Sequence, residues 1–252
     1  MEIIKKIKRM PIANTQKDKI LKVLNVFETG STEGKYDNIS IYKDGTVNGQ
    51  KVYQITYGRS QTTEYGNLKR LIELYISRKW KLADAFKPYV NKIGKSPSLR
   101  TNVAFKKLLK QAANEDTIMR TTQDEFFDMY YYQPGFNWFA GQKFTHALSL
   151  LVIYDSFIHS GGIPDFLRKR FAELTPFNGG NEQTWIKQYV DTRHEWLRTH
   201  SNTILQKTIY RTNCLKNQIK NNNWDLAKAI NANGTIIAWL KKKKYSLRHV
   251  LA

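Results

Sequence analysis

Residues 20–34 read ILKVLNVFETGSTEG, an apolar run that ends on an acid and then on glycines. The apolar residues repeat at the i, i+3, i+4 spacing of one helical face: Ile20, Val23, Leu24 and Phe27. We therefore predict an amphipathic helix over 17–27, with Glu28 directly after it and a helix stop over 29–34. The negative end of a helix dipole disfavours an ionised carboxylate, so a carboxyl group placed there suits a general acid.

A strand-rich stretch follows this helix. Residues 39–42 and 52–57 alternate apolar and polar side chains, and Asp44-Gly45 and Asn48-Gly49 are both hairpin signals. We predict a small antiparallel sheet over about 36–58.

The rest of the chain has mainly helical periodicity. Predicted helices begin near Tyr65 and cover about 79–93, 101–113, 121–132, 142–160, 164–173, 181–198 and 202–221. Residues 147–155 are apolar nearly all round, which indicates a central buried helix. A last hairpin turn is expected at 231–235. The fold class is thus α+β and mainly α-helical, as one domain over 1–252.

The chain of 252 residues has a formal net charge of +20. The segment 201–252 carries ten Lys and Arg against one acid, including the run Lys241–Lys244. Such a surface attracts polyanions and repels polycations, although a basic face that serves only solubility is the alternative. The single cysteine, Cys214, excludes a disulfide framework within the chain.

We expect neither a metal nor a cofactor, because the five histidines lack metal-ligand spacing and no glycine-rich phosphate loop is present. The N-terminus is basic without a continuous apolar core, so we expect neither a signal peptide nor a membrane span.

Glu28 and Asp44 form a candidate catalytic pair. Cleavage of a glycosidic bond needs one carboxylic acid to protonate the leaving oxygen and one carboxylate to activate water. Asp44 lies beside a predicted turn, where solvent should keep it ionised. Two unrelated surface acids would give the same spacing.

Several ordered blocks resemble glycoside hydrolase family 46, the chitosanases, in the lysozyme superfamily. The first is Val26-Phe27-Glu28-Thr29-Gly30-Ser31-Thr32-Glu33 with Tyr36, and Asp44-Gly45 and Thr56 follow in order. Later blocks are Gln123-Asp124 with Tyr130–Pro134, then Ile153–Ser156, Val190–Arg193 and Tyr210–Asn213.

The resemblance implies a lysozyme-like two-lobed fold, in which the sheet flanks an active-site cleft. It makes Glu28 the general acid, Asp44 the general base and Thr56 the residue that orients the water. It also implies an ion-pair network that supports the acid, made by Asp155, Arg193 and Arg211. Since family members invert the anomeric centre, the two carboxyl groups should stand roughly 6.5–9.5 Å or more apart, with room for water between them.

The substrate-binding residues implied are Tyr36, Arg59 and Asn67, and here the chain departs from the family. The family's Asp-Gly-Arg-Gly-Tyr-Thr signature is stretched, and its arginine is missing. Asn67 stands where the family has an acid that holds a glucosamine ammonium. A neutral amide removes that Coulombic attraction, which weakens the case for polycationic chitosan.

We therefore expect endo-cleavage of a β-1,4-linked amino-sugar polymer. The alternatives are a peptidoglycan-cleaving enzyme of phage or secretion-system type, and a non-catalytic module that binds a wall or another polyanion. The expected partners are a polysaccharide, a polyanionic surface reached through the basic segment, and a larger assembly. The expected location is extracellular or at a cell wall.

Overall fold

The computed structural model describes residues 12–59 and 61–238. The N-terminal half contains α1 (Asn14–Thr29), β1 (Ile39–Val47), β2 (Gln50–Tyr57), β3 (Thr62–Thr63), α2 (Leu68–Ser77), α3 (Ala83–Val90), η1 (Leu99–Thr101), α4 (Val103–Glu115) and α5 (Thr117–Phe127). The remainder contains η2 (Asp128–Tyr132), α6 (Gln133–Gly141), α7 (Ala147–Ser160), α8 (Asp165–Arg168), η3 (Pro176–Asn178), α9 (Glu182–Arg198), α10 (Thr203–Gln206), α11 (Ile209–Lys220), β4 (Ile230–Ala232) and β5 (Thr235–Ile237).

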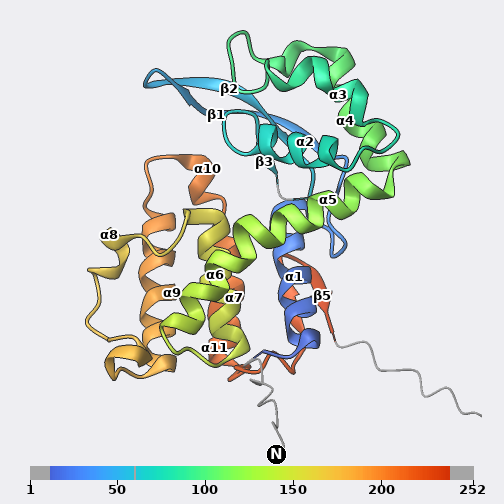
Figure 1. Ribbon diagram of the computed structural model, residues 1–252. Helices are drawn as coiled ribbons and strands as arrows, with labels where there is room; N and C mark the ends of the chain where they lie inside the picture. The colour runs from blue at the N-terminus through green and yellow to red at the C-terminus, as the bar shows by residue number, and fades with distance from the viewer. Residues whose placement is uncertain (1–11, 60, 239–252) are drawn as a thin grey trace, which may run out of the picture.

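Buried apolar side chains form two separate clusters. One, from Ile55 to Phe126, lies among β2 and α2–α5, and we call this part the sheet lobe. The other gathers α1, α6, α7, α9, α11 and the β4–β5 hairpin, and we call this part the helical lobe. Figure 1 shows the sheet lobe above the helical lobe, with α5 running obliquely between them. The fold is mainly helical α+β with a small N-terminal sheet, as predicted.

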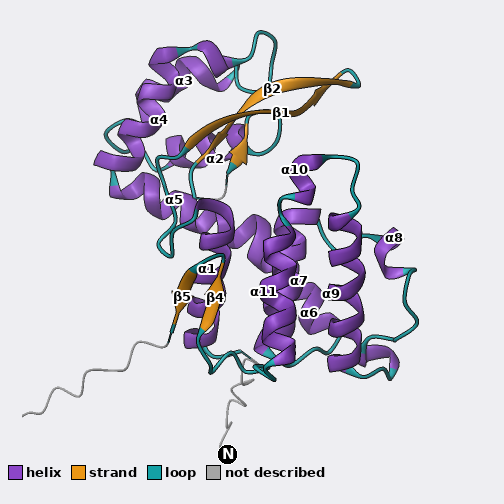
Figure 2. Cartoon of the chain, turned by 180° about the vertical axis from the view of Figure 1, so that it is seen from behind, coloured by secondary structure: helices purple, strands orange, loops and turns teal. Residues whose placement is uncertain are grey.

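The central helix of the helical lobe is α7. Ten consecutive residues from Ala147 to Ser156 are buried, which agrees with the apolar run in the sequence. Figure 2 shows α7 enclosed by α6, α9 and α11. Because Asp155 lies in this buried run, its carboxylate must find its partners inside the protein. None of the helices in the described part of the chain is long and apolar enough to span a membrane.

The three-stranded sheet has the order β1-β2-β3 and is antiparallel. Its hairpin turns at Asn48-Gly49, as predicted. Asp44-Gly45, the other expected turn, lies inside β1, so that prediction was wrong. The register shifts there, because Tyr42 pairs with Gln54 but Gly45 pairs with Val52. Two residues of β1, Lys43 and Asp44, thus oppose one residue of β2, which is a β-bulge.

The helix that joins the two lobes also differs from the prediction. A π-helical turn, η2, follows α5 without a break, and α6 continues the path although Pro134 lies in its first turn. Proline is tolerated at the start of a helix because its missing N–H would have no intrahelical partner there. The sequence periodicity ends at Tyr132, which is why α6 was missed.

Other boundaries moved by a few residues. The region 164–173 holds only the four-residue α8, and 202–221 is split into α10 and α11. The terminal hairpin over 231–235 is confirmed by β4 and β5. The run Lys241–Lys244 lies outside the described residues.

Candidate active site

The last turn of α1 carries Glu28, and α11 holds that turn in place. The Arg211 guanidinium forms an ion pair with Glu28 through Nη2 and Oε1. Its neighbour Tyr210 donates a hydrogen bond of 2.7 Å to the Phe27 carbonyl, one of those that a helix end leaves without an intrahelical partner. Gly30 ends the helix with φ of +72° and donates its N–H to the Val26 carbonyl at 2.9 Å. Glu28 thus sits on a capped and anchored helix end, with 15% of its side chain exposed.

A buried chain of charges lies behind Glu28. Asp155 accepts two hydrogen bonds of 2.6 Å, one on each carboxylate oxygen. Arg211 Nη1 donates to Oδ1, and Arg193 Nη1 donates to Oδ2. The three side chains are exposed by 3% or less. Burial alone would raise the pKa of Asp155, but Arg193 and Arg211 lower it to about 2. The three predicted supporting residues therefore meet, and they reach Glu28 through Arg211.

His159 closes this network on the far side of Arg193. Arg193 Nη2 lies 3.1 Å from His159 Nδ1, and Arg193 Nε donates to Ser160 Oγ at 3.2 Å. Burial, followed by the charges of Arg211 and Arg193, lowers the pKa of His159 to about 3. The imidazole is therefore neutral near pH 7, and its Nδ1 can accept from Arg193. Sequence reasoning did not single out His159, since a lone histidine carries no signal of its partners.

Asp44 projects from the bulge of β1 and is exposed. Its Oδ1 accepts a hydrogen bond of 2.8 Å from Gln54 Nε2. Thr56, the predicted water-orienting residue, pairs with Ser40 farther along the sheet and is 3% exposed. Its hydroxyl lies 2.9 Å from Gln61 Oε1 and 3.3 Å from the Ser40 carbonyl. Gln54 is thus the side chain that contacts Asp44, and the role given to Thr56 stays a prediction.

Asn67 and Tyr131 are linked by a hydrogen bond, and Tyr131 interacts electrostatically with Glu28. Asn67 occupies the N-cap position of α2, yet its side chain makes no capping hydrogen bond. Burial raises the pKa of Tyr131, a hydrogen bond with Asn67 opposes this shift, and the charge of Glu28 adds to it. Tyr131 lies in the π-helical turn η2. Asn67 thus contacts a tyrosine that interacts with Glu28, and its role in substrate binding stays a prediction.

The other two predicted binding residues lie at the junction of the lobes. Tyr36 donates its hydroxyl to Asp124 Oδ1 at 2.9 Å, and Arg59 forms an ion pair with the same carboxylate. Arg59 also donates to Asn25 Oδ1 at 3.0 Å and is 8% exposed. These contacts tie α1, the loop after β2 and α5 together. Substrate binding by Tyr36 and Arg59 stays a prediction.

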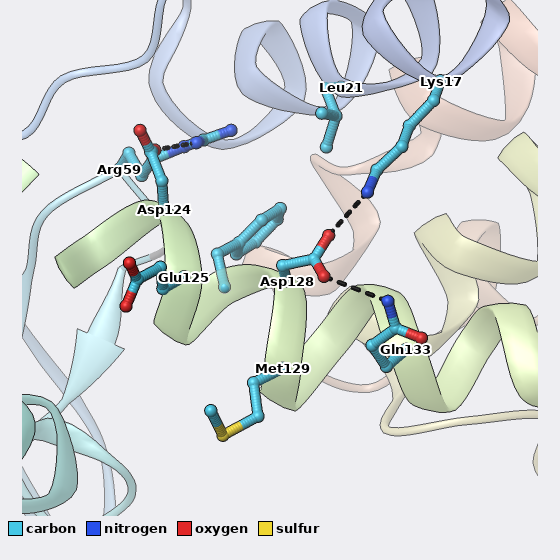
Figure 3. A pocket seen from close by; sticks show the side chains of 9 residues that line it. Lys17, Leu21, Arg59, Asp124, Glu125, Asp128, Met129 and Gln133 are labelled. Carbon is cyan, nitrogen blue, oxygen red and sulfur yellow. Dashed lines mark hydrogen bonds and ion pairs between the residues drawn. The ribbon is translucent and has the colours of Figure 1, made fainter. Parts of the chain in front are cut away.

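A pocket of about 750 Å³ opens beside this junction. Figure 3 shows Arg59 paired with Asp124 at one end, and Asp128 between Lys17 and Gln133 at the other. Glu28, Asp44 and Thr56 are not among its lining residues. The predicted catalytic residues therefore do not line this pocket. Within residues 12–59 and 61–238, no group of three or more His, Cys, Asp or Glu side chains is placed to hold a metal ion.

A carboxyl group held by a buried cation lies at the end of α1, and a second, solvent-facing carboxylate lies on the sheet lobe. Two carboxyl groups of these kinds are what general acid and general base catalysis of glycosidic cleavage requires. A family model described as glycosyl hydrolase family 46 matches residues 22–230. No curated protein matches the chain.

Solved structures of chitosanases resemble the fold. The native chitosanase of Bacillus subtilis MY002 is 25% identical with a TM-score of 0.75, and the match covers 90% of this chain and 99% of that one. A mutant of that enzyme complexed with 6 GlcN is 25% identical with a TM-score of 0.74, and the match covers 90% of this chain and 99% of that one. The GH46 chitosanase of Gynuella sunshinyii, in complex with chitotetraose, is 22% identical with a TM-score of 0.75 and coverages of 90% and 98%, which shows the fold alone.

Proposed function

The chain belongs to glycosyl hydrolase family 46, and we propose that it cleaves a β-1,4-linked amino-sugar polymer from within, with Glu28 as general acid and Asp44 as general base. The observation that carries the proposal is the buried sequence of contacts from Arg193 through Asp155 and Arg211 to Glu28. Burying these charges is costly, and the result is one carboxyl group held in a defined orientation at the end of α1.

In the proposed reaction Glu28 enters in its protonated form and donates that proton to the glycosidic oxygen as the bond to the anomeric carbon breaks. Arg211 keeps the Glu28 carboxyl group directed at that oxygen, and it is itself fixed by Asp155. Burial lowers the pKa of Arg211, but the charges of Glu28 and Asp155 raise it well above its ordinary value, so Arg211 stays a cation throughout.

Asp44 takes a proton from the water that attacks the opposite face of the sugar ring. Its exposed position on the bulge supports this role, because it leaves the carboxylate accessible to the attacking water. Attack from the opposite face inverts the anomeric centre and needs room for a water molecule between the carboxyl groups, so a separation of roughly 6.5–9.5 Å is expected.

Two polymers fit the proposal to different degrees. Chitosan is supported by the family and by two structural relatives solved in complex with 6 GlcN and with chitotetraose. An N-acetylated polymer such as peptidoglycan is supported by Asn67, a neutral amide that forms a hydrogen bond with Tyr131, and by the net charge of +20. Both polymers are found outside cells or in cell walls, where we propose the enzyme acts.

The test is release of reducing ends from chitosan, chitin oligomers and purified peptidoglycan by wild type and by Glu28→Gln. We expect the variant to lose activity on whichever polymer the wild type cleaves, by a factor of at least about 100. Glu33→Gln is the matched control, since Glu33 is an exposed acid five residues farther along the loop, and it should retain activity.

The outcomes separate the competing interpretations. Wild type that cuts none of the three polymers would favour the non-catalytic binding module. A Glu28→Gln enzyme as active as wild type would remove Glu28 from the mechanism. Proton NMR of the first product reports the anomer, and retention of configuration would exclude the inverting assignment.

A further inference from the structure

Gln54 on β2 has a buried side-chain amide whose oxygen and nitrogen both form hydrogen bonds. The residue is 4% exposed. The Gln54 Oε1 atom accepts the backbone N–H of Tyr65 at 3.0 Å. Because an N–H can only donate, this contact orients the amide and directs Nε2 toward Asp44 Oδ1, 2.8 Å away. The orientation of the donor is thus determined by the turn after β3.

The β-bulge brings Asp44 to this donor. Gln54 pairs with Tyr42 and Val52 pairs with Gly45, and alternate residues of β2 lie on one face. With one extra residue in β1, both Asp44 and Gly45 point to the face that carries Gln54. A bulge often re-aims a side chain at a functional site, and here it directs Asp44 at a buried amide.

Gly45 shows how closely the bulge packs against this amide. A Cβ atom at Gly45 would lie 3.2 Å from Gln54 Cδ, 3.0 Å from Tyr65 Cδ2 and 3.1 Å from Val52 Cγ2. A glycine beside Asp44 thus permits the close approach on which the hydrogen bond depends.

We propose that Gln54 is the positioning residue for Asp44. This inference rests on the proposed function, in which Asp44 is the general base. Gln54 holds Oδ1 of Asp44 by a hydrogen bond to an ionised group, which is among the stronger kinds. Oδ2 is then left to accept the proton of the attacking water, whose hydroxyl goes to the anomeric carbon. Gln54 takes up no proton, and it acts only through the orientation of Asp44.

The test compares Gln54→Met with Gln50→Met. Methionine matches glutamine in size but cannot donate to Asp44, and Gln50 is an exposed glutamine on the same strand. We expect kcat of Gln54→Met to fall roughly 10- to 100-fold with KM little changed, because a small misplacement of a catalytic group has effects of that size. Gln50→Met should match wild type. Wild-type kcat in a folded Gln54→Met enzyme would overturn the proposal.

A double-mutant cycle separates positioning from a general structural role. In an Asp44→Ala background, Gln54→Met should cause no further loss of kcat, because the carboxylate on which it acts is gone. If the fold-losses of kcat from Gln54→Met and Asp44→Ala multiply in the double variant, the proposal is overturned. Should Gln54→Met fail to fold, Gln54→Glu serves instead, since it keeps an acceptor for the Tyr65 N–H and removes the donor to Asp44.

The two proposals fail in different ways. If Asp44→Ala keeps the wild-type rate, the proposed base is wrong and the role of Gln54 falls with it. If Asp44→Ala is inactive while Gln54→Met is fully active, the proposed function stands and only the inference about Gln54 is overturned.

Discussion

At the residue scale, the ion pairs behind Glu28 depend on a histidine that stays neutral. His159 accepts from Arg193, and Arg193 in turn holds Asp155. A protonated imidazole would place a third cation beside the guanidinium groups of Arg193 and Arg211. Burial, together with that repulsion, is the reason the pKa of His159 is low.

This low pKa makes folding stability depend on pH. The unfolded chain binds a proton at His159 below its ordinary pKa of 6.5, whereas the folded protein does so only near a pKa of about 3. The free energy of unfolding should therefore fall as pH drops from 6.5 toward 3. The amide oxygen of His159→Gln can still accept a hydrogen bond from Arg193, but the amide does not titrate in this range. The part of the fall in stability that is due to His159 should therefore disappear in this variant. Urea unfolding of wild type and His159→Gln between pH 6.5 and pH 3 measures this difference in stability. A His159 imidazole that titrates near pH 6.5 by NMR would contradict the prediction.

At the element scale, the C-terminal end of α1 places the proposed acid. Gly30 adopts φ of +72° and has no heavy atom within 4 Å of an added Cβ, so only its backbone conformation favours glycine. Gly30→Ala should destabilise the protein by about 1 kcal/mol and loosen the turn that carries Glu28.

Denaturant unfolding checks this, with Gly141→Ala as the control. Gly141 ends α6 without a positive φ and also has open space around its Cβ position. Alanine there should be neutral or stabilising by up to about 1 kcal/mol. Equal destabilisation by the two substitutions would show that the conformation of Gly30 is not the cause.

The elements differ in how well local sequence predicts them. Hydrophobic periodicity placed α1, α4, α7 and α9 within a few residues, because each buries one face or all of its surface. Asp44-Gly45 was interpreted as a turn since this dipeptide is common in hairpins. Its place in a bulge depends on the pairing of β1 with β2, which a local pattern does not contain.

At the scale of the whole molecule, the chain carries a large positive charge. The net charge of +20 should repel chitosan at low salt and attract an anionic wall polymer. As ionic strength rises from about 0.01 M to 0.1 M, the screening length falls from about 30 Å to about 10 Å. The KM for chitosan should therefore fall with added salt, whereas binding to peptidoglycan with anionic decoration should weaken.

Kinetics on chitosan and sedimentation with purified walls measure the two effects. Neutral chitin oligomers are the control and should show little dependence on salt. A KM for chitosan that rises with salt would mean that acids around the cleft outweigh the net charge in attracting the substrate.

The amino-acid sequence by itself determined the elements with strong periodicity, the fold class and, through ordered blocks, the candidate Glu28 and its supporting residues. Only the tertiary structure decided which side chains meet. Arg211 reaches Glu28 from 183 residues away because α11 packs beside the end of α1, and Gln54 meets Asp44 because a bulge shifts the strand register. Such contacts arise from packing between distant segments, whereas periodicity reports only which face of one segment is buried.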